Sequence, residues 1–347
     1  MRCLNCIKLS RLWAYILAIS LVACEGKGEF EQDVSQLVSA DLIEIPLHFP
    51  EIDFPSDNLP SLARISLGKK LFYDNMLSRD KTVSCASCHI PQYAFSDTIP
   101  VSIGEHGGVG QRNAPPLHNV AYLPRFFRDG GIPNLELQIK APIEDQLEMN
   151  YNMHELTLRI ASDSAYQRMA RKAYSRDMDA FVIKRSLANF MRTFISGNSK
   201  YDRAQKGVAE LSQSEKRGLE IFFGDDAKCS TCHGGFNFTN NTYVNNGSHS
   251  YYADTGRARI TLRHNDHGKF RVPSLRNCQV TAPYMYDGCY RSLEDVLDQY
   301  QRGGTGHWNQ HNTIEQIVLS DSDKKDLIAF LTTLTDQNFL NNDALRK

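Results

Sequence analysis

Two stretches of the chain carry apolar residues at helical spacing. Residues 179–199 have apolar side chains mainly three or four positions apart, at Phe181, Leu187, Phe190, Met191 and Phe194. This spacing places them on one face of an α-helix, which Gly197 is expected to end. Residues 320–334, SDSDKKDLIAFLTTL, show a similar pattern, with Ser320 as the expected N-cap. The pattern therefore predicts a mainly α-helical protein.

A weak internal repeat divides the chain. GKKLFYD begins at Gly68 and GLEIFFGD begins at Gly218. Ser212 and Glu215 are spaced as a capping box that opens the second helix. Three and four positions after each glycine stands an apolar pair, Leu71–Phe72 and Ile221–Phe222. Chance similarity of two short helices is the alternative, but both copies precede the same cysteine motif, which favours duplication.

Two segments between the predicted helices are long and irregular. Residues 101–118 and 234–273 are rich in glycine, proline and asparagine. Loops of this length inside a compact domain usually carry function. We therefore expect part of the functional site on them.

The first residues read as an export signal. Arg2, Lys8 and Arg11 precede the apolar run LWAYILAISLVA, which is short for a membrane span. LVAC, ending at Cys24, is similar to a bacterial lipobox, which predicts cleavage before Cys24 and lipid on its sulfur. An ordinary signal peptide with an incidental cysteine is the alternative. The lipobox predicts a lipid-anchored protein of the periplasm or cell envelope.

Composition limits the class of protein. Hydrophobic residues make up 41% of the 347 positions and charged residues 23%, which is typical of a globular chain. The formal net charge is −1, and loss of the three basic residues before Cys24 brings it near −4. This balance gives no indication of a nucleic-acid partner.

The cysteines carry the most specific signal. CASCH at 85–89 and CSTCH at 229–233 have the same spacing and the same trailing histidine. Two thiols on one helical turn can form thioethers to one porphyrin, and the next histidine can bind its iron, so C-x-x-C-H predicts covalent haem c. The alternative is one zinc ion held by four thiolates, which needs no histidine after each pair. The residues predicted to hold one haem are Cys85, Cys88 and His89, and those predicted to hold the other are Cys229, Cys232 and His233.

Cys278 and Cys289 lie outside both motifs. An exported chain can keep disulfides, so these two either form a bridge or remain free thiols.

Four longer stretches resemble one family. KLFYDNMLSRDKTVSCASCHIPQYAFSD, VGQRNAPPLHNVAYLPRFFRDGG, LELQIKAPIEDQLEMN and FRVPSLRNCQVTAPYMYDG are similar to motifs of the bacterial dihaem cytochrome c peroxidases and come in the same order. The match runs from about residue 58 to 335.

The resemblance implies two cytochrome c-like helical domains. The first, at 58–203, would hold a peroxidatic haem, and the second, at 204–335, an electron-transferring haem. A signal peptide (1–23) and a tether (24–57) would precede them, and a tail (336–347) would follow. The oligomeric state stays open, with a homodimer among the alternatives.

Site residues follow from the same resemblance. Met285 matches the sixth ligand of the electron-transferring haem, and His106 matches the distal histidine of the resting peroxidatic haem. Glu148 matches the general acid–base group that moves a proton in peroxide cleavage, and Gln138 matches its partner in the distal pocket. Asn113 matches a ligand of a calcium ion between the domains.

One position departs from the family pattern. Arg128 stands where many relatives have a tryptophan that is thought to lie between the haems. Because arginine cannot be oxidised as an indole can, electrons would pass through haem edges or aromatics such as Phe127.

The resemblance implies reduction of hydrogen peroxide to water, with electrons from a small c-type cytochrome or a copper protein. One alternative is an oxidase that matures the tryptophan-derived quinone of a partner protein. Such relatives use tyrosine as an axial ligand, and Tyr284 and Tyr286 are candidates for that role. Met285 argues against this alternative. The other alternative is a dihaem electron carrier without catalysis.

Overall fold

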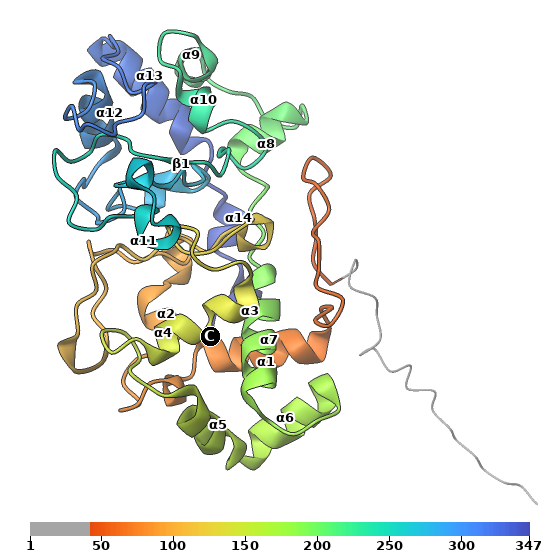
Figure 1. The fold of residues 1–347 in the computed structure, drawn as a ribbon. Coiled ribbons are helices and arrows are strands. Elements are labelled where there is room, and N and C mark those ends of the chain that lie inside the picture. The colour runs from red at the N-terminus through yellow and green to blue at the C-terminus, as the bar shows by residue number, and fades with distance from the viewer. Residues whose placement is uncertain (1–41) are drawn as a thin grey trace, which may run out of the picture. The chain divides into compact units, whose positions relative to one another are not determined.

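A computed structural model describes residues 42–347, so the predicted leader and Cys24 lie outside the described residues. Its regular structure is mainly helical, as predicted (Figure 1). Helices of the first half are α1 (Leu62–Phe72), α2 (Cys85–Cys88), α3 (Leu135–Gln138), α4 (Lys140–Glu144), α5 (Met153–Ala161), α6 (Ser164–Tyr174) and α7 (Ala180–Arg192). They are followed by α8 (Lys200–Gln205), α9 (Gln213–Phe223), α10 (Cys229–Cys232), α11 (Ala258–Thr261), α12 (Leu293–Gln301), α13 (Asp321–Thr332) and α14 (Gln337–Leu340).

The long loop of the second half is pinned by a small antiparallel sheet. Strand β1 (Tyr243–Val244) pairs with β2 (Phe270–Arg271), with Tyr243 opposite Arg271. Both long segments predicted as loops, 101–118 and 234–273, hold only short elements. Within residues 42–347, no helix has both the length and the apolar character needed to cross a bilayer.

The sequence repeat corresponds to two similar helix pairs. Helix α1 packs against α7, and α9 packs against α13. A Cβ atom at Gly68 would lie 1.9 Å from the carbonyl oxygen of Ser186, and one at Gly218 would lie 1.9 Å from that of Asp326. Both distances are far inside van der Waals contact, so each helix crossing requires glycine. The shared glycine therefore has the same structural cause in both halves.

The predicted helix starts are confirmed, and one predicted end is wrong. Ser212 and Glu215 form the capping box of α9, and Ser320 caps α13. Helix α7 ends at Arg192 rather than near Gly197. The amide of Gly197 instead donates to Asp336 Oδ2 at 3.0 Å, and Pro46 leaves no room for a side chain at this position. Gly197 is thus required by packing and not by a helix end.

Each half has its own apolar core. The first core centres on α1 and α7 and includes Leu67, Phe72, Phe190 and Phe194. The second centres on α9 and α13 and includes Phe222, Phe238, Leu327 and Phe330. Cys85 packs against the first core and Cys229 against the second, so each motif is anchored to a different core.

The predicted tether and tail both pack against other parts of the described chain. Phe339, Leu340 and Leu345 of the predicted tail belong to the first core. Tyr73 donates to the carbonyl of Leu345 at 2.5 Å. In the predicted tether, Phe49 is buried, since its ring packs on Phe236 at 4.7 Å between centroids. The apolar residues of the predicted tail therefore complete the first core.

Candidate functional site

The first cysteine motif presents two thiols and an oriented histidine. Cys85 and Cys88 are the first and last residues of α2 and form no disulfide. Nδ1 of His89 lies 2.8 Å from the carbonyl oxygen of Phe95. A carbonyl oxygen only accepts, so Nδ1 carries the proton and Nε2 keeps its lone pair. Burial lowers the pKa of His89, which favours this neutral form.

The second motif repeats this arrangement. Cys229 and Cys232 are the first and last residues of α10 and form no disulfide. Nδ1 of His233 lies 3.1 Å from the carbonyl oxygen of Pro273 and 3.3 Å from that of Phe238. Burial lowers the pKa of His233 to about 4. Both histidines are therefore neutral near pH 7, with Nε2 ready to bind a metal ion.

The zinc alternative does not fit this geometry. A four-thiolate site needs all four sulfur atoms around one ion. Among residues 42–347, the side-chain groups close enough to share an ion include neither motif. Two separate covalent sites remain the better fit.

A cavity opens beside the second motif. Cys229, Cys232 and His233 line it, together with Met285 and mainly apolar side chains. The backbone of Met285 adopts a left-handed conformation, with φ of +75°. The Asn246 amide donates to its sulfur at 3.1 Å. The structure thus brings Met285 and His233 to one cavity, as a shared haem would require.

Sequence reasoning missed Tyr300, which lines the same cavity. Burial, with smaller contributions from Cys229 and Cys232, raises the pKa of its phenol to about 12. A signal was present, because Leu293, Leu297 and Tyr300 follow helical spacing on α12 and all face the cavity. The tyrosines that the sequence analysis names, Tyr284 and Tyr286, flank Met285 in the chain, whereas Tyr300 lies further along, on α12.

Glu148 lies near the first motif. Its charge contributes to the raised pKa of both Cys85 and Cys88. The residue as a whole is exposed, whereas burial of its carboxyl group, with Asp145 nearby, raises its pKa to about 7. A carboxyl group with this pKa can both take up and release a proton near neutral pH.

The loop of His106 is attached to Glu148. The amide of Glu105 donates to the carbonyl oxygen of Glu148 at 2.8 Å. A Cβ atom at Gly104 would lie 2.1 Å from the carbonyl oxygen of Leu147, so glycine allows this close approach. The side chain of His106 is 73% exposed, with Nδ1 3.9 Å from Asp80 Oδ2. Its role as an iron ligand stays a prediction.

Gln138 ends α3 and is half-buried. The preceding residues fix the helix, since Glu136 pairs with Arg192 at 2.7 Å. The part of Gln138 in the site also stays a prediction.

The residues around Asn113 do not fit the calcium ion implied by the resemblance. Arg128 Nη2 donates to Asn113 Oδ1 at 2.7 Å, and Arg128 Nε donates to the Asn113 carbonyl at 3.0 Å. The oxygen expected to bind calcium therefore already has a cationic partner. The Asn113 amide nitrogen donates to the carbonyl of Ile99 at 3.2 Å.

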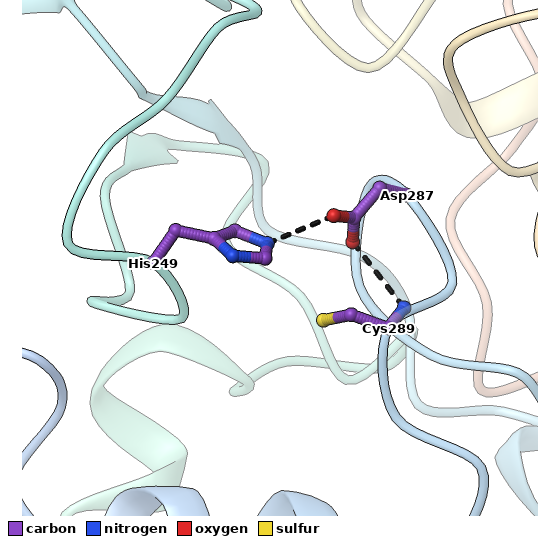
Figure 2. A group of neighbouring side chains, drawn as sticks. All are labelled: His249, Asp287 and Cys289. Atoms are coloured by element: carbon purple, nitrogen blue, oxygen red, sulfur yellow. Dashed lines mark hydrogen bonds and ion pairs between the residues drawn. The ribbon is translucent and has the colours of Figure 1, made fainter.

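Cys278 and Cys289 form no bridge. Cys278 is buried in the second core, and Cys289 is exposed. Figure 2 shows Cys289 beside Asp287 and His249. The Cys289 amide donates to Asp287 Oδ1 at 3.3 Å, and His249 Nε2 lies 2.8 Å from Asp287 Oδ2.

The comparisons with known proteins agree with this geometry. Residues 62–210 match the family model described as di-haem cytochrome c peroxidase. The chain is 32% identical to the methylamine utilization protein MauG of Methylorubrum extorquens, over 96% of each protein. It is 30% identical to cytochrome c551 peroxidase of Pseudomonas aeruginosa, over 73% of this chain and 75% of that protein.

A solved structure extends the likeness to the fold. A MauG-like protein associated with microbial copper homeostasis superposes with a TM-score of 0.83 at 32% identity. The superposition covers 87% of this chain and 97% of that one. With two cysteine motifs on two separate cores and a sequence likeness that spans nearly its whole length, the chain belongs to the di-haem cytochrome c peroxidase and MauG family.

Proposed function

We propose that this protein is a dihaem c-type peroxidase that reduces hydrogen peroxide to two water molecules. The reaction consumes two electrons and two protons. The electrons come from a small c-type cytochrome or a cupredoxin. The observation that carries this proposal is the place of Glu148, close enough to the first motif for its charge to raise the pKa of Cys85 and Cys88. Burial of the Glu148 carboxyl group raises its own pKa to about 7.

The residues at both motifs fit haem c. Cys85 and Cys88 would hold the first haem with His89, and the second motif would hold the other in the same way. When bound, the haems supply a peroxide-binding iron at the first site and a one-electron store at the second.

The protein's own contribution is proton transfer. Peroxide cleavage needs a proton moved from the near oxygen to the far one, so that water leaves. Glu148 in its carboxylate form accepts the first proton and returns it to the departing oxygen. His89 keeps its proton on Nδ1 because Nδ1 donates a hydrogen bond to the Phe95 carbonyl, and this bond fixes the ring orientation.

A turnover assay tests the function directly. Protein carrying both haems should oxidise reduced cytochrome c only when hydrogen peroxide is added, with two cytochromes consumed per peroxide. Protein that carries both haems but consumes no peroxide with any cytochrome or cupredoxin would rule the peroxidase out.

One observation favours a second candidate, the oxidation of a partner protein. Tyr300 and Met285 both line the cavity beside the second motif. A tyrosine as the axial haem ligand is what the quinone-maturing oxidase would require. Asn246 is close to both side chains, since it donates to the Met285 sulfur and its amide lowers the pKa of Tyr300. The axial ligand therefore separates the two candidates.

The variants Met285→Leu and Tyr300→Phe form a matched pair. If Met285 binds the iron, Met285→Leu should lower the midpoint potential of the second haem, because a thioether stabilises ferrous iron. Tyr300→Phe should then leave that midpoint unchanged. Redox titration with visible spectra measures both. The reverse result, a response to Tyr300→Phe alone, would favour the oxidase.

We also propose that the protein is lipid-anchored in the cell envelope, on the strength of the LVAC motif that ends at Cys24. The native protein should partition into membranes, and Cys24→Ala should release it. Mass spectrometry of the mature N-terminus measures the modification directly. An unmodified N-terminus on a fully soluble wild-type protein would contradict the anchor.

A further inference from the structure

Arg128 lines the cavity beside the second cysteine motif. Its guanidinium donates only to Asn113 among the hydrogen bonds of residues 42–347. Burial, together with the charges of Arg271 and Arg112, lowers the pKa of Arg128 to about 9. Arg128 is half-buried, and a guanidinium that is largely removed from water without a carboxylate partner is unfavourable. This position therefore calls for an anion.

A second guanidinium stands beside it. Arg271 also lines the cavity, and its amide donates to the carbonyl oxygen of Arg128 at 2.7 Å. Its Nε is buried and lacks a hydrogen-bond partner within the described chain. Burial lowers the pKa of Arg271 as well. Two neighbouring guanidiniums thus share one cavity wall.

The nearby acidic groups are already engaged. Arg112 forms salt bridges with Asp129 at 2.7 Å and with Asp254 at 2.6 Å. The negative charge of Asp287 is close enough to Arg128 to raise the pKa of Arg128. Asp287, however, already pairs with His249 (Figure 2). Neither Arg128 nor Arg271 forms a salt bridge with any residue in 42–347. The missing negative charge must therefore come from the occupant of the cavity.

We propose that Arg128 and Arg271 form an anion site that binds the carboxylate groups of the haem held by the second motif. This rests on the proposed function only in requiring the second haem. Arginine suits the site, since its planar fork can hold a carboxylate with two parallel hydrogen bonds. Arg128 also takes the place at Asn113 that the family resemblance assigns to calcium, so the protein needs no calcium there.

The potential of the second haem tests the pairing. Reduction adds negative charge, so a nearby fixed positive charge favours the reduced state. Arg128→Met and Arg271→Met should therefore each lower the midpoint of the second haem and leave that of the first unchanged. Arg128→Lys keeps the charge and should retain most of the wild-type midpoint. Arg263→Met removes an exposed arginine and is the matched control.

Midpoints and haem content do not depend on peroxide turnover, so the site is tested separately from the peroxidase. A pyridine haemochrome count precedes each titration, and loss of the second haem in Arg128→Met but not in Arg128→Lys would also support the site. Midpoints of Arg128→Met and Arg271→Met equal to that of Arg263→Met would overturn it.

Elemental analysis of wild-type protein should find no bound calcium after dialysis without chelator. One tightly bound calcium per chain, lost together with activity in Asn113→Ala, would overturn the role of Arg128 at Asn113.

Discussion

Replacing Glu148 with glutamine should slow peroxide turnover by about 100- to 10,000-fold, the range expected when one general acid–base group is lost. Glutamine keeps the size of the side chain but can neither accept nor return the proton. Because the carboxylate is the form that accepts the first proton, and its pKa is about 7, the wild-type rate should rise as the pH increases through 7. Glu148→Gln should lack this rise.

Two measurements keep the interpretation specific. Redox titration of Glu148→Gln should give both midpoints close to wild type, since the carboxyl group acts in proton transfer and not as an iron ligand. Glu155→Gln makes the same chemical change at an exposed position on α5 and should keep full activity. A Glu148→Gln protein with full activity and an unchanged pH profile would show that another group moves the proton.

The largest effect on stability is expected at Asp202. Asp202 and Arg276 are each 1% exposed and are joined by two hydrogen bonds of 2.8 and 2.9 Å. Arg276 also donates to the carbonyl oxygen of Phe236 at 2.9 Å. Asp202→Asn leaves the guanidinium buried without its counter-charge, which should lower the free energy of unfolding by about 3–5 kcal/mol.

Urea unfolding of protein with both haems measures this loss. Asp177→Asn is the control, because Asp177 pairs with Arg171 on the surface, and exposed pairs contribute about 0–1 kcal/mol. The pH dependence has a definite sign. Burial alone would raise the pKa of Asp202, but hydrogen bonds from Arg276 and Ser199 lower it to about 2. Its contribution is therefore present above about pH 4 and lost as the pH falls towards 2. Equal losses in Asp202→Asn and Asp177→Asn would contradict this ranking.

Local rules explain what the sequence could predict. Caps such as Ser212 and Ser320 act within one helical turn, and a C-x-x-C-H run fits one porphyrin within five residues, so both can be recognised without the fold. The glycines at 68 and 218 stood out only because the chain repeats them, and their cause, the approach of a second helix, required the structure.

The misses involve residues far apart in the chain. Gly197 resembles a helix end, but its role depends on Asp336 and Pro46, which no local pattern connects with it. Asn113 has the right chemistry for calcium, and only its contact with Arg128 shows that its oxygen is engaged. Tyr300 differs from these cases. Its helical spacing with Leu293 and Leu297 can be read from the sequence, but only the structure places it in one cavity with Met285.

The return of residues 339–345 to the first core bears on the order in which the protein assembles. During synthesis, the segment 58–203 emerges long before Phe339 and Leu345, so its core lacks these apolar side chains until nearly the whole chain is available. The first core is therefore complete only after the second half of the chain has been made. A fragment cut between them would leave an apolar gap on the first half and an unpaired apolar segment on the second, and each would favour aggregation or exchange of that segment between molecules.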